Sequence, residues 1–263
     1  MKFRDAMFAR PQSSNWRNAL ASWTCPTDPA NSDGECDPCG SNTAWGNWDH
    51  IGCLGDPLPG ESFRFEVPGD GIVTNMHITD YKIEGAVPIE ELCNFPQLRE
   101  FDVDGGWLEG PIPGGFGTCF QELEEIDLSY NNLSGPLPPE IAENPALRHF
   151  KVEVNQAVTG GIPPEYGSME SLQWLRLGVN KMSGEIPEEL SKTSARLHHM
   201  TMDQNDFEGN LYPFKDHKFV NFLPQNNPKL CGMVPLGVRY AHGFNYYNTQ
   251  LGLPCPEEVG KAE

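Results

Sequence analysis

Three aspartates have the side-chain type and spacing that most readily suggest chemistry. Asp102 and Asp127 lie 25 residues apart in two segments of similar sequence, and Asp104 follows the first of them. Two carboxyl groups at a suitable separation can hydrolyse a glycosidic bond, one of them acting as a general acid. Such an acid needs a raised pKa, which burial produces and an open strand surface does not. We therefore predict that the protein is not an enzyme and has no catalytic residue and no cofactor.

Metal binding is the other chemistry that these residue types could support. The aspartates could bind calcium, but the sequence has no loop of the EF-hand kind. His198 and His199 are neighbours in a predicted strand, where successive side chains point to opposite faces, so they do not form a ligand pair. These residues therefore predict no metal site.

The motif Cys36-Asp-Pro-Cys39 allows two further interpretations. With Cys25 and Cys53 it could bind zinc, and as a C-x-x-C motif it could be redox-active. Zinc sites usually have two closely spaced cysteine pairs, whereas only one is present, and a thioredoxin-like motif needs a βαβ context. Structural disulfides are the favoured interpretation.

A run of sequence repeats determines where the aspartates lie. Two of its copies, LEEIDLSYNNLSGPLP and LQWLRLGVNKMSGEIP, both fit L-x-x-L-x-L-x-x-N-x-L followed by x-G-x-[IL]-P. This is the leucine-rich repeat signature, which predicts an α/β solenoid. Six copies follow one another at intervals of 24 or 25 residues, with first residues Val73, Leu98, Leu123, Leu147, Leu172 and Leu197.

Each position of the repeat has a structural role. Alternation places Ile126 and Leu128 inward and Asp127 outward, which predicts short strands that stack into a parallel sheet. A buried asparagine after each strand can bond backbone groups of the following turn; the predicted positions are Asn131, Asn155, Asn180 and Asn205. Glycine then permits a tight bend, and proline holds the return arm extended.

The G-x-[IL]-P half of the repeat resembles plant-type leucine-rich repeat proteins, which include receptor-kinase ectodomains and polygalacturonase-inhibiting proteins. The resemblance implies a right-handed superhelix with parallel strands on the concave face and irregular or 3-10 arms on the convex face. It also implies disulfide-bonded caps at both ends and a plant or algal source. The chain departs from the pattern at Tyr81 and Gly106, which replace asparagine.

This pattern divides the chain into three parts. Residues 1–72 are predicted to form a cysteine-rich cap, residues 73–211 the six repeats, and residues 212–263 a C-terminal cap with a short tail. The stretch SFRFEV predicts a strand that pairs with the N-terminal cap. In the C-terminal cap, four aromatic residues most simply plug the end of the core, the alternative being an exposed patch for a partner; they are Tyr240, Phe244, Tyr246 and Tyr247.

Disulfide pairing follows partly from the repeat and partly from the resemblance. Cys93 and Cys119 have nearly equal offsets in adjacent repeats, so a Cys93–Cys119 bridge is geometrically plausible. The resemblance to the closing stretch of plant-type arrays implies Cys231–Cys255. In the N-terminal cap, Cys25–Cys36 with Cys39–Cys53 is favoured among three possible connectivities.

Composition and charge exclude several classes of partner. The 263 residues include 37 acidic and 18 basic residues, for a formal net charge of −19. Nucleic acid and anionic membranes attract basic patches, so neither is expected as the main partner. No stretch of eighteen apolar residues is present, so we predict no membrane span, and the first ten residues are not followed by the apolar region of a signal peptide.

Paired cysteines indicate an oxidising compartment. We predict a secreted, extracellular protein, with the lumen of an organelle as the alternative; reduced thiols in a cytosolic solenoid are the competing interpretation. Asn132-Leu133-Ser134 is an N-glycosylation acceptor, for which an occupied site and an unused one are the two alternatives.

The concave sheet face is the usual binding surface of a solenoid. Its predicted ligand-binding residues are His77, Asp102, Asp104, Asp127, Ser129, Tyr130, Lys151, Glu153, Trp174, Arg176, His199 and Asp203. They form an acidic cluster in the second and third repeats with a basic step beside it. We predict a non-catalytic module that binds a protein, peptide or glycan ligand, a cationic one included. The alternatives are a structural subunit of a larger extracellular or luminal assembly and, for the face itself, a merely solvated surface.

Overall fold

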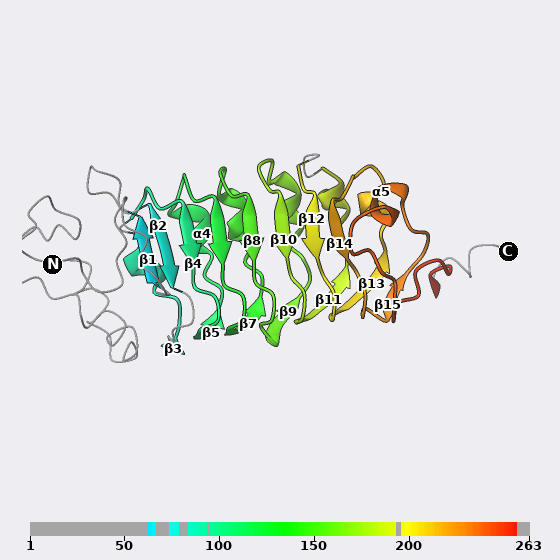
Figure 1. Ribbon diagram of the computed structural model, residues 1–263, viewed down its shortest axis with the longest axis horizontal. Coiled ribbons are helices and arrows are strands. Elements are labelled where there is room, and N and C mark those ends of the chain that lie inside the picture. Colours follow the sequence, from blue (N-terminus) through cyan, green and yellow to red (C-terminus); the bar gives the residue numbers. More distant parts are fainter. Residues whose placement is uncertain (1–62, 67–73, 79–83, 94, 193–195, 257–263) are drawn as a thin grey trace, which may run out of the picture.

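A computed structural model describes residues 63–66, 74–78, 84–93, 95–192 and 196–256 of the chain. These residues form an elongated stack of coils, and each coil contributes one strand to each of two long sheets (Figure 1). The predicted pairs Cys25–Cys36 and Cys39–Cys53 lie outside the described residues, as does most of the predicted N-terminal cap.

The first sheet has eight strands in the order β1-β2-β4-β6-β8-β10-β12-β14. All neighbours in it are parallel except β1 and β2. Its strands are β1 (Phe63–Glu66), β2 (Asn75–Ile78), β4 (Glu100–Asp102), β6 (Glu125–Asp127), β8 (His149–Lys151), β10 (Trp174–Arg176), β12 (His199–Thr201) and β14 (Asn221–Leu223). We call the outward surface of this sheet the sheet face.

The second sheet has seven parallel strands and lies along another side of the stack. They are β3 (Glu84–Gly85), β5 (Trp107–Pro111), β7 (Asn132–Pro136), β9 (Ala157–Gly160), β11 (Lys181–Glu185), β13 (Asp206–Asn210) and β15 (Lys229–Cys231). Short helical arms complete the coils: α3 (Ile89–Leu92), α4 (Gly115–Thr118), η1 (Pro139–Glu143), η2 (Pro164–Ser168), η3 (Glu188–Lys192) and η4 (Tyr212–Phe214). The predicted solenoid with parallel strands and 3-10 arms is confirmed.

The core follows from the alternation of the strands. Phe101, Ile126, Phe150 and Leu175 are the central residues of β4, β6, β8 and β10, and all four side chains are fully buried. All four belong to one continuous core that packs within coils, as Phe101 does against Phe116, and between coils, because a single coil cannot bury its apolar face alone. The residues on either side of each therefore face away from the core.

A ladder of buried asparagines closes the turn after each strand of the first sheet. The side-chain nitrogen of Asn155 donates to the carbonyl of Val152 at 3.1 Å and to that of Leu128, in the preceding coil, at 2.9 Å. Its side-chain oxygen accepts the backbone N–H of Leu133 at 3.0 Å. Asn131, Asn180 and Asn205 likewise donate to one carbonyl in their own coil and one in the preceding coil, as expected for a buried asparagine at this position. Asn131 and Asn205 also accept the backbone N–H of Leu108 and Met182.

The residue before the ladder asparagine has a left-handed backbone. The φ angle is +60° at Val154 and +58° at Val179, a conformation that β-branched residues rarely adopt. The hydrogen bonds of the asparagine that follows hold these residues there, together with their own N–H groups, which donate to Gly178 and Asp203 of the next coil. The ladder therefore stabilises a turn that local sequence preference opposes.

The solenoid continues beyond Leu211. Strand β14 pairs with β12 and β15 pairs with β13, both in parallel. Asn227 extends the ladder, donating to the carbonyls of Pro224 and Met202 at 2.9 Å each. The segment assigned to the C-terminal cap thus contributes another coil, in which Phe219, Phe222 and Pro224 replace the usual aliphatic residues.

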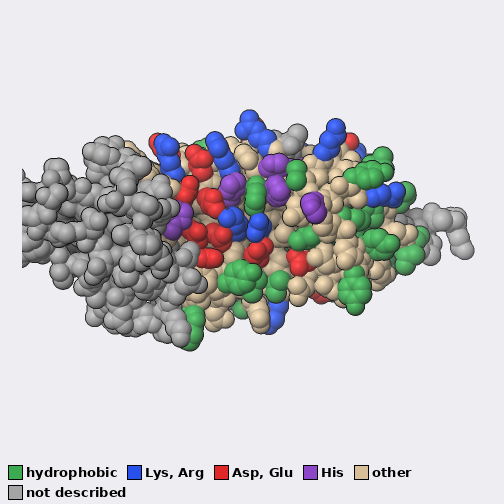
Figure 2. Space-filling view, in the orientation of Figure 1, with side chains coloured by type: hydrophobic (Ala, Val, Ile, Leu, Met, Phe, Trp, Pro, Cys, Tyr) green, Lys and Arg blue, Asp and Glu red, His purple; other side chains and the backbone are tan. Residues whose placement is uncertain are grey.

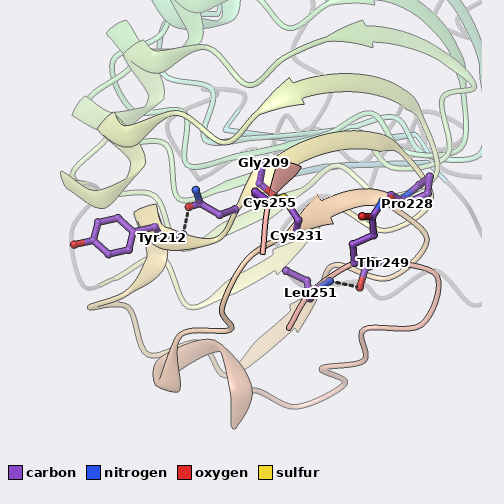
Figure 3. Close-up of a disulfide and its surroundings, with 9 residues drawn as sticks. Gly209, Tyr212, Pro228, Cys231, Thr249, Leu251 and Cys255 are labelled. Atoms are coloured by element: carbon purple, nitrogen blue, oxygen red, sulfur yellow. Dashed lines mark hydrogen bonds between the residues drawn. A yellow bond between two sulfur atoms is a disulfide. The ribbon is translucent and has the colours of Figure 1, made fainter. Parts of the chain in front are cut away.

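Both disulfides within the described residues match the predicted pairs. Cys93–Cys119 joins the arms that contain α3 and α4. Cys231–Cys255 joins β15 to the end of the described chain (Figure 3). Each bridge closes a loop of about one coil.

The expectations for the two ends of the array have different outcomes. Strand β1 exists and pairs antiparallel with β2, Phe63 opposite Ile78; its predicted pairing with the N-terminal cap involves residues outside the described part. The expectation that aromatic residues of the C-terminal cap plug the core is correct only for Phe244, which is partly buried and packs against the core, whereas Tyr240, Tyr246 and Tyr247 are 82%, 62% and 69% exposed. Smaller apolar side chains seal the last coil instead; they are Leu230, Val238, Ala241 and Leu251.

We expect Asn155→Ala to lower the free energy of unfolding by about 2–4 kcal/mol, because it leaves several buried backbone groups without partners. The urea midpoint, followed by circular dichroism, measures the loss. Asn132→Ala is the matched control, since Asn132 is exposed on β7, and it should change stability by less than about 0.5 kcal/mol. Equal midpoints for the two variants would contradict the role of the ladder.

Candidate binding face

The parallel register aligns the outward residues of the first sheet in two rows. One row contains Glu100, Glu125, His149, Trp174 and His199, and the other Asp102, Asp127, Lys151, Arg176 and Thr201. Figure 2 shows acidic side chains on β4 and β6, followed by basic and histidine side chains over the later strands. The sheet face therefore has an acidic half and a cationic, aromatic half.

The acidic half includes a carboxylate that is only partly satisfied. His77 Nε2 lies 3.1 Å from Glu100 Oε2, and His77 Nδ1 lies 3.4 Å from Asp102 Oδ2. The other oxygen of Asp102 is buried and has no hydrogen-bond partner among the described residues. Because that oxygen is buried, a ligand would meet only the exposed part of the Asp102 side chain, 21% of its surface.

Lys151 joins the two halves of the sheet face. Its Nζ binds Glu125 Oε1 and lies 3.1 Å from Asp127 Oδ2. The second oxygen of Glu125 accepts a hydrogen bond from His149 Nδ1 at 2.8 Å. The bond from His149, together with that from Lys151, outweighs burial and lowers the pKa of Glu125 to about 2.

Burial and the ion pairs act in opposite directions on Lys151. Burial by itself lowers the pKa of the ammonium group, but the hydrogen bond to Glu125 and the negative charges of Asp127 and Glu125 outweigh it, so the pKa is raised. Lys151 and Glu125 therefore both stay charged over the ordinary pH range. This ion pair connects β6 to β8, at the boundary between the acidic half and the cationic, aromatic half of the sheet face.

A ridge of stacked rings forms the other half, and we call it the Trp174 ridge. The Trp174 ring lies 5.2 Å from the ring of His149 and 4.3 Å from that of His199, one on each neighbouring strand. Arg176 Cζ lies 4.8 Å from the centre of the Trp174 ring, and the rings of His198 and His199 are 4.7 Å apart. The side chain of Trp174 is half-buried, so part of it remains open to solvent.

The two adjacent histidines correct the expectation that they point to opposite faces. His198 precedes β12 rather than lying within it, so the alternation of a strand does not apply, and its Nδ1 lies 3.1 Å from the carbonyl oxygen of Gln173. Burial, followed by the charges of His198, Arg176 and His149, lowers the pKa of His199. The ridge is therefore neutral at His199 and cationic at Arg176 near pH 7.

Arg176 also connects to the next row along the sheet face. Its Nη1 lies 3.4 Å from Glu153 Oε1, and the hydroxyl of Thr201 donates to Glu153 Oε2 at 3.2 Å. Asp203 lies beside Gly178, where an added Cβ would be 2.6 Å from Asp203 Oδ1. Glycine at that position leaves the space that the Asp203 carboxylate occupies.

Most of the predicted site residues lie on this one surface. Ser129 is 4% exposed and so differs from the expectation, and Tyr130 is exposed but lies at the turn, beyond the strand. The residues that the structure brings together are His77, Asp102, Asp127, Lys151, Glu153, Trp174, Arg176 and His199.

Sequence reasoning missed His149, which bridges Glu125 and Trp174. The signal was available in the register: His149 occupies the same repeat position as Trp174, 25 residues earlier. No group of three potential metal-ligating side chains is found within the described residues. Nor does any described helix have the length and apolar character needed to cross a membrane.

Known proteins share this architecture. The family model described as Leucine Rich Repeat matches residues 122–144, and no curated protein matches the chain. Among solved structures, the chain is similar to that of Pollen Receptor Kinase 3, with 26% identity and a TM-score of 0.59, over 81% of this chain and 88% of that one.

Two longer chains are also similar to this one. One is the plant peptide hormone receptor RGFR1 in complex with RGF2, with 26% identity and a TM-score of 0.52, over 66% of this chain and 32% of that one. The other is the PEPR1–AtPEP1 structure, with 20% identity and a TM-score of 0.64, over 92% of this chain and 29% of that one. The protein thus spans less than a third of either of these chains, and its resemblance to plant-type leucine-rich repeat proteins is confirmed.

Glu125→Gln should lower stability by about 1–2 kcal/mol near neutral pH, between the values of exposed and buried ion pairs. The pKa of Glu125 is depressed in the folded state, so its contribution is complete above about pH 4.5 and is lost as the pH falls toward about 2. Melting temperatures measured from pH 2 to 7 should therefore converge for the variant and the native protein at the acid end.

Glu109→Gln on β5 is the control, because Glu109 is exposed on the second sheet. Its melting curves should follow those of the native protein at every pH. A Glu125→Gln difference that stays constant down to pH 2 would show that the ion pairs with His149 and Lys151 do not cause the effect.

Proposed function

We propose that this plant-type leucine-rich repeat protein is a non-catalytic, extracellular module that binds an extended peptide segment across the sheet face from β4 to β12. The observation that carries the proposal is Trp174, a half-buried ring on an open sheet face, held between His149 and His199. An aromatic residue fixed in this way loses little conformational freedom when it binds, which suits it as an interface anchor.

The rows of the sheet face suggest how a peptide would lie. A basic side chain of the ligand would approach the partly exposed carboxylate of Asp102, beside the acidic side chain of Glu100. An apolar or aromatic side chain would pack on Trp174, three strands further along. A peptide that crosses the strands could make both contacts, with its backbone near Lys151.

Peptide is favoured over glycan by the separation of these two features. A cation-accepting carboxylate and an aromatic anchor on different strands match a chain that carries different side chains at intervals. The similarity to RGFR1, a peptide hormone receptor solved with RGF2, supports the same class. A general acid needs a pKa raised by burial, and an open sheet face does not favour such a pKa, which supports a binding role rather than hydrolysis.

An extracellular location is supported by the disulfides Cys93–Cys119 and Cys231–Cys255. Asn132 supports it further, because it is exposed at the start of β7, on the second sheet and away from the sheet face. A glycan on Asn132 would leave the proposed binding surface open.

The peptide proposal can be tested with a displayed library of random peptides selected on the native protein. We expect Trp174→Ala to weaken the selected peptides roughly 30-fold, as loss of an interface anchor does. Asp102→Lys should weaken them at least about tenfold and reduce the salt dependence of binding. Isothermal titration calorimetry measures both effects.

Matched controls are available on the second sheet. Trp107→Ala and Glu109→Lys make the same changes at exposed positions of β5, and they should leave peptide affinity unchanged. Peptides that bind Trp174→Ala and Asp102→Lys as tightly as the native protein would refute the assignment of the sheet face.

Asn132 should carry an N-linked glycan when the protein is expressed through a secretory pathway. Mass spectrometry of the peptide that contains Asn132, before and after treatment with a glycan-removing amidase, measures occupancy. Ser134→Ala removes the acceptor and should abolish the added mass, while Ser129→Ala in the same coil should not. An unmodified Asn132 in the secreted protein would refute this modification.

A further inference from the structure

The C-terminal end of the solenoid carries an exposed apolar surface. Six large apolar side chains between residues 233 and 253 are 60% to 84% exposed: Met233, Leu236, Tyr240, Tyr246, Tyr247 and Leu253. They come from the end of β15, from α5 (Leu236–Arg239) and from the loop that follows it, which form the last layer of the stack (Figure 1). We call this group of side chains the terminal surface.

The backbone beneath the terminal surface is already satisfied. His242 accepts from Phe222 at 3.3 Å and donates to Val220 at 2.7 Å, which covers the edge of β14. Gln250 and Gly252 donate to Leu230 and Gly232 at 2.7 and 2.8 Å, which covers β15. A partner therefore cannot extend either sheet by strand addition and has to meet the side chains.

The terminal surface differs from the rest of the chain in charge. Residues 217–256 contain no aspartate or glutamate and three basic residues, whereas residues 1–216 contain 34 acidic and 14 basic residues, a net −20. The last seven residues, which lie outside the described part, add three glutamates and one lysine. Of the three basic residues, Lys229 is paired with Asp206 at 2.7 Å.

This composition matches the centre of a protein–protein interface. Tyrosine, methionine and arginine are enriched in such interfaces, and acidic residues are depleted. The terminal surface has three exposed tyrosines, Met233 and, on α5, Arg239. Six exposed apolar side chains in one terminal layer, in a segment without acidic residues, indicate a contact surface rather than a solvated end.

We propose that the terminal surface joins two copies of this chain end to end, in a two-fold dimer. Two chains that each carry a net −20 over residues 1–216 repel each other when their sides meet. The end-to-end arrangement brings together the two regions that lack acidic residues. A two-fold axis makes the same patch face itself and closes the assembly at two copies.

The length of the solenoid keeps the acidic halves apart in this dimer. Strand β6 is four strands from β14, which is about 20 Å at the strand spacing of a sheet. The acidic halves of two chains joined at β14 are therefore more than about 40 Å apart, well beyond the ~8 Å screening length at physiological salt. Tyrosine–tyrosine contacts and contacts of Arg239 with the partner's tyrosines can therefore form at a distance from both acidic halves.

Sedimentation velocity of the whole, oxidised chain from 1 to 100 µM tests the dimer. We expect a reversible monomer–dimer equilibrium that stops at two copies and is as strong or stronger in 0.5 M than in 0.05 M NaCl. The double variant Leu236→Glu/Tyr240→Glu should weaken association at least tenfold. Tyr130→Glu is the matched control, because Tyr130 is 55% exposed elsewhere on the molecule, and it should associate as the native chain does.

Hydrogen exchange provides a second measurement that needs no variant. Amides of residues 236–253 should exchange more slowly at 100 µM than at 1 µM, while those of β4 and β6 should not change. A chain that is monomeric at 100 µM overturns the proposal. Assembly into ever larger oligomers that salt weakens also overturns it, because the terminal surface would then bind the acidic half of the next copy. A dimer that the double variant leaves intact overturns it as well.

Discussion

The hydrogen bonds of the buried asparagine ladder are the interaction on which the rest of the structure depends. Asn155 joins three backbone groups, two of which belong to the preceding coil, and Asn227 does the same at the far end. These bonds hold Val154 and Val179 at positive φ, against their own preference. The turn they enforce sets the pitch, so that one coil stacks on the next in constant register.

Constant register turns a one-dimensional repeat into a surface with rows. Glu125, His149 and Trp174 are far apart along the chain, but the ladder places them side by side on adjacent strands. Ion pairs and ring stacking then form between coils, and they fix side chains that would be mobile on an isolated strand. A sheet face arranged in this way offers a ligand a rigid anchor beside a carboxylate that is not fully satisfied.

The sheet face is charged and the terminal surface is apolar because their side chains have different neighbours. Side chains on the sheet face are held by neighbours on both sides, so acids and bases can be paired there, as Lys151 is with Glu125 and Asp127. The last coil has a neighbour on one side only, and its apolar residues must be covered by a cap. Here the cap itself exposes tyrosines in an acid-free segment, which separates the two surfaces both in charge and in position.

The sequence by itself determined the solenoid, its parallel strands, the ladder at Asn131 to Asn205 and the Cys93–Cys119 bridge, because these depend on residue types at a fixed period, whereas Cys231–Cys255 followed from the resemblance to plant-type arrays. It also placed Trp174 and Arg176 on one face. Only the tertiary structure decided what depends on contacts between coils: the role of His149, the contact between His198 and His199, and the burial of Ser129. The ends of the array could not be predicted for the same reason. The coil at Phe219–Asn227 departs from the repeat, and the exposure of Tyr240 depends on which side chains pack into the core of the last coil. A periodic pattern specifies what each coil shares with its neighbours, and it carries no information about where that environment stops.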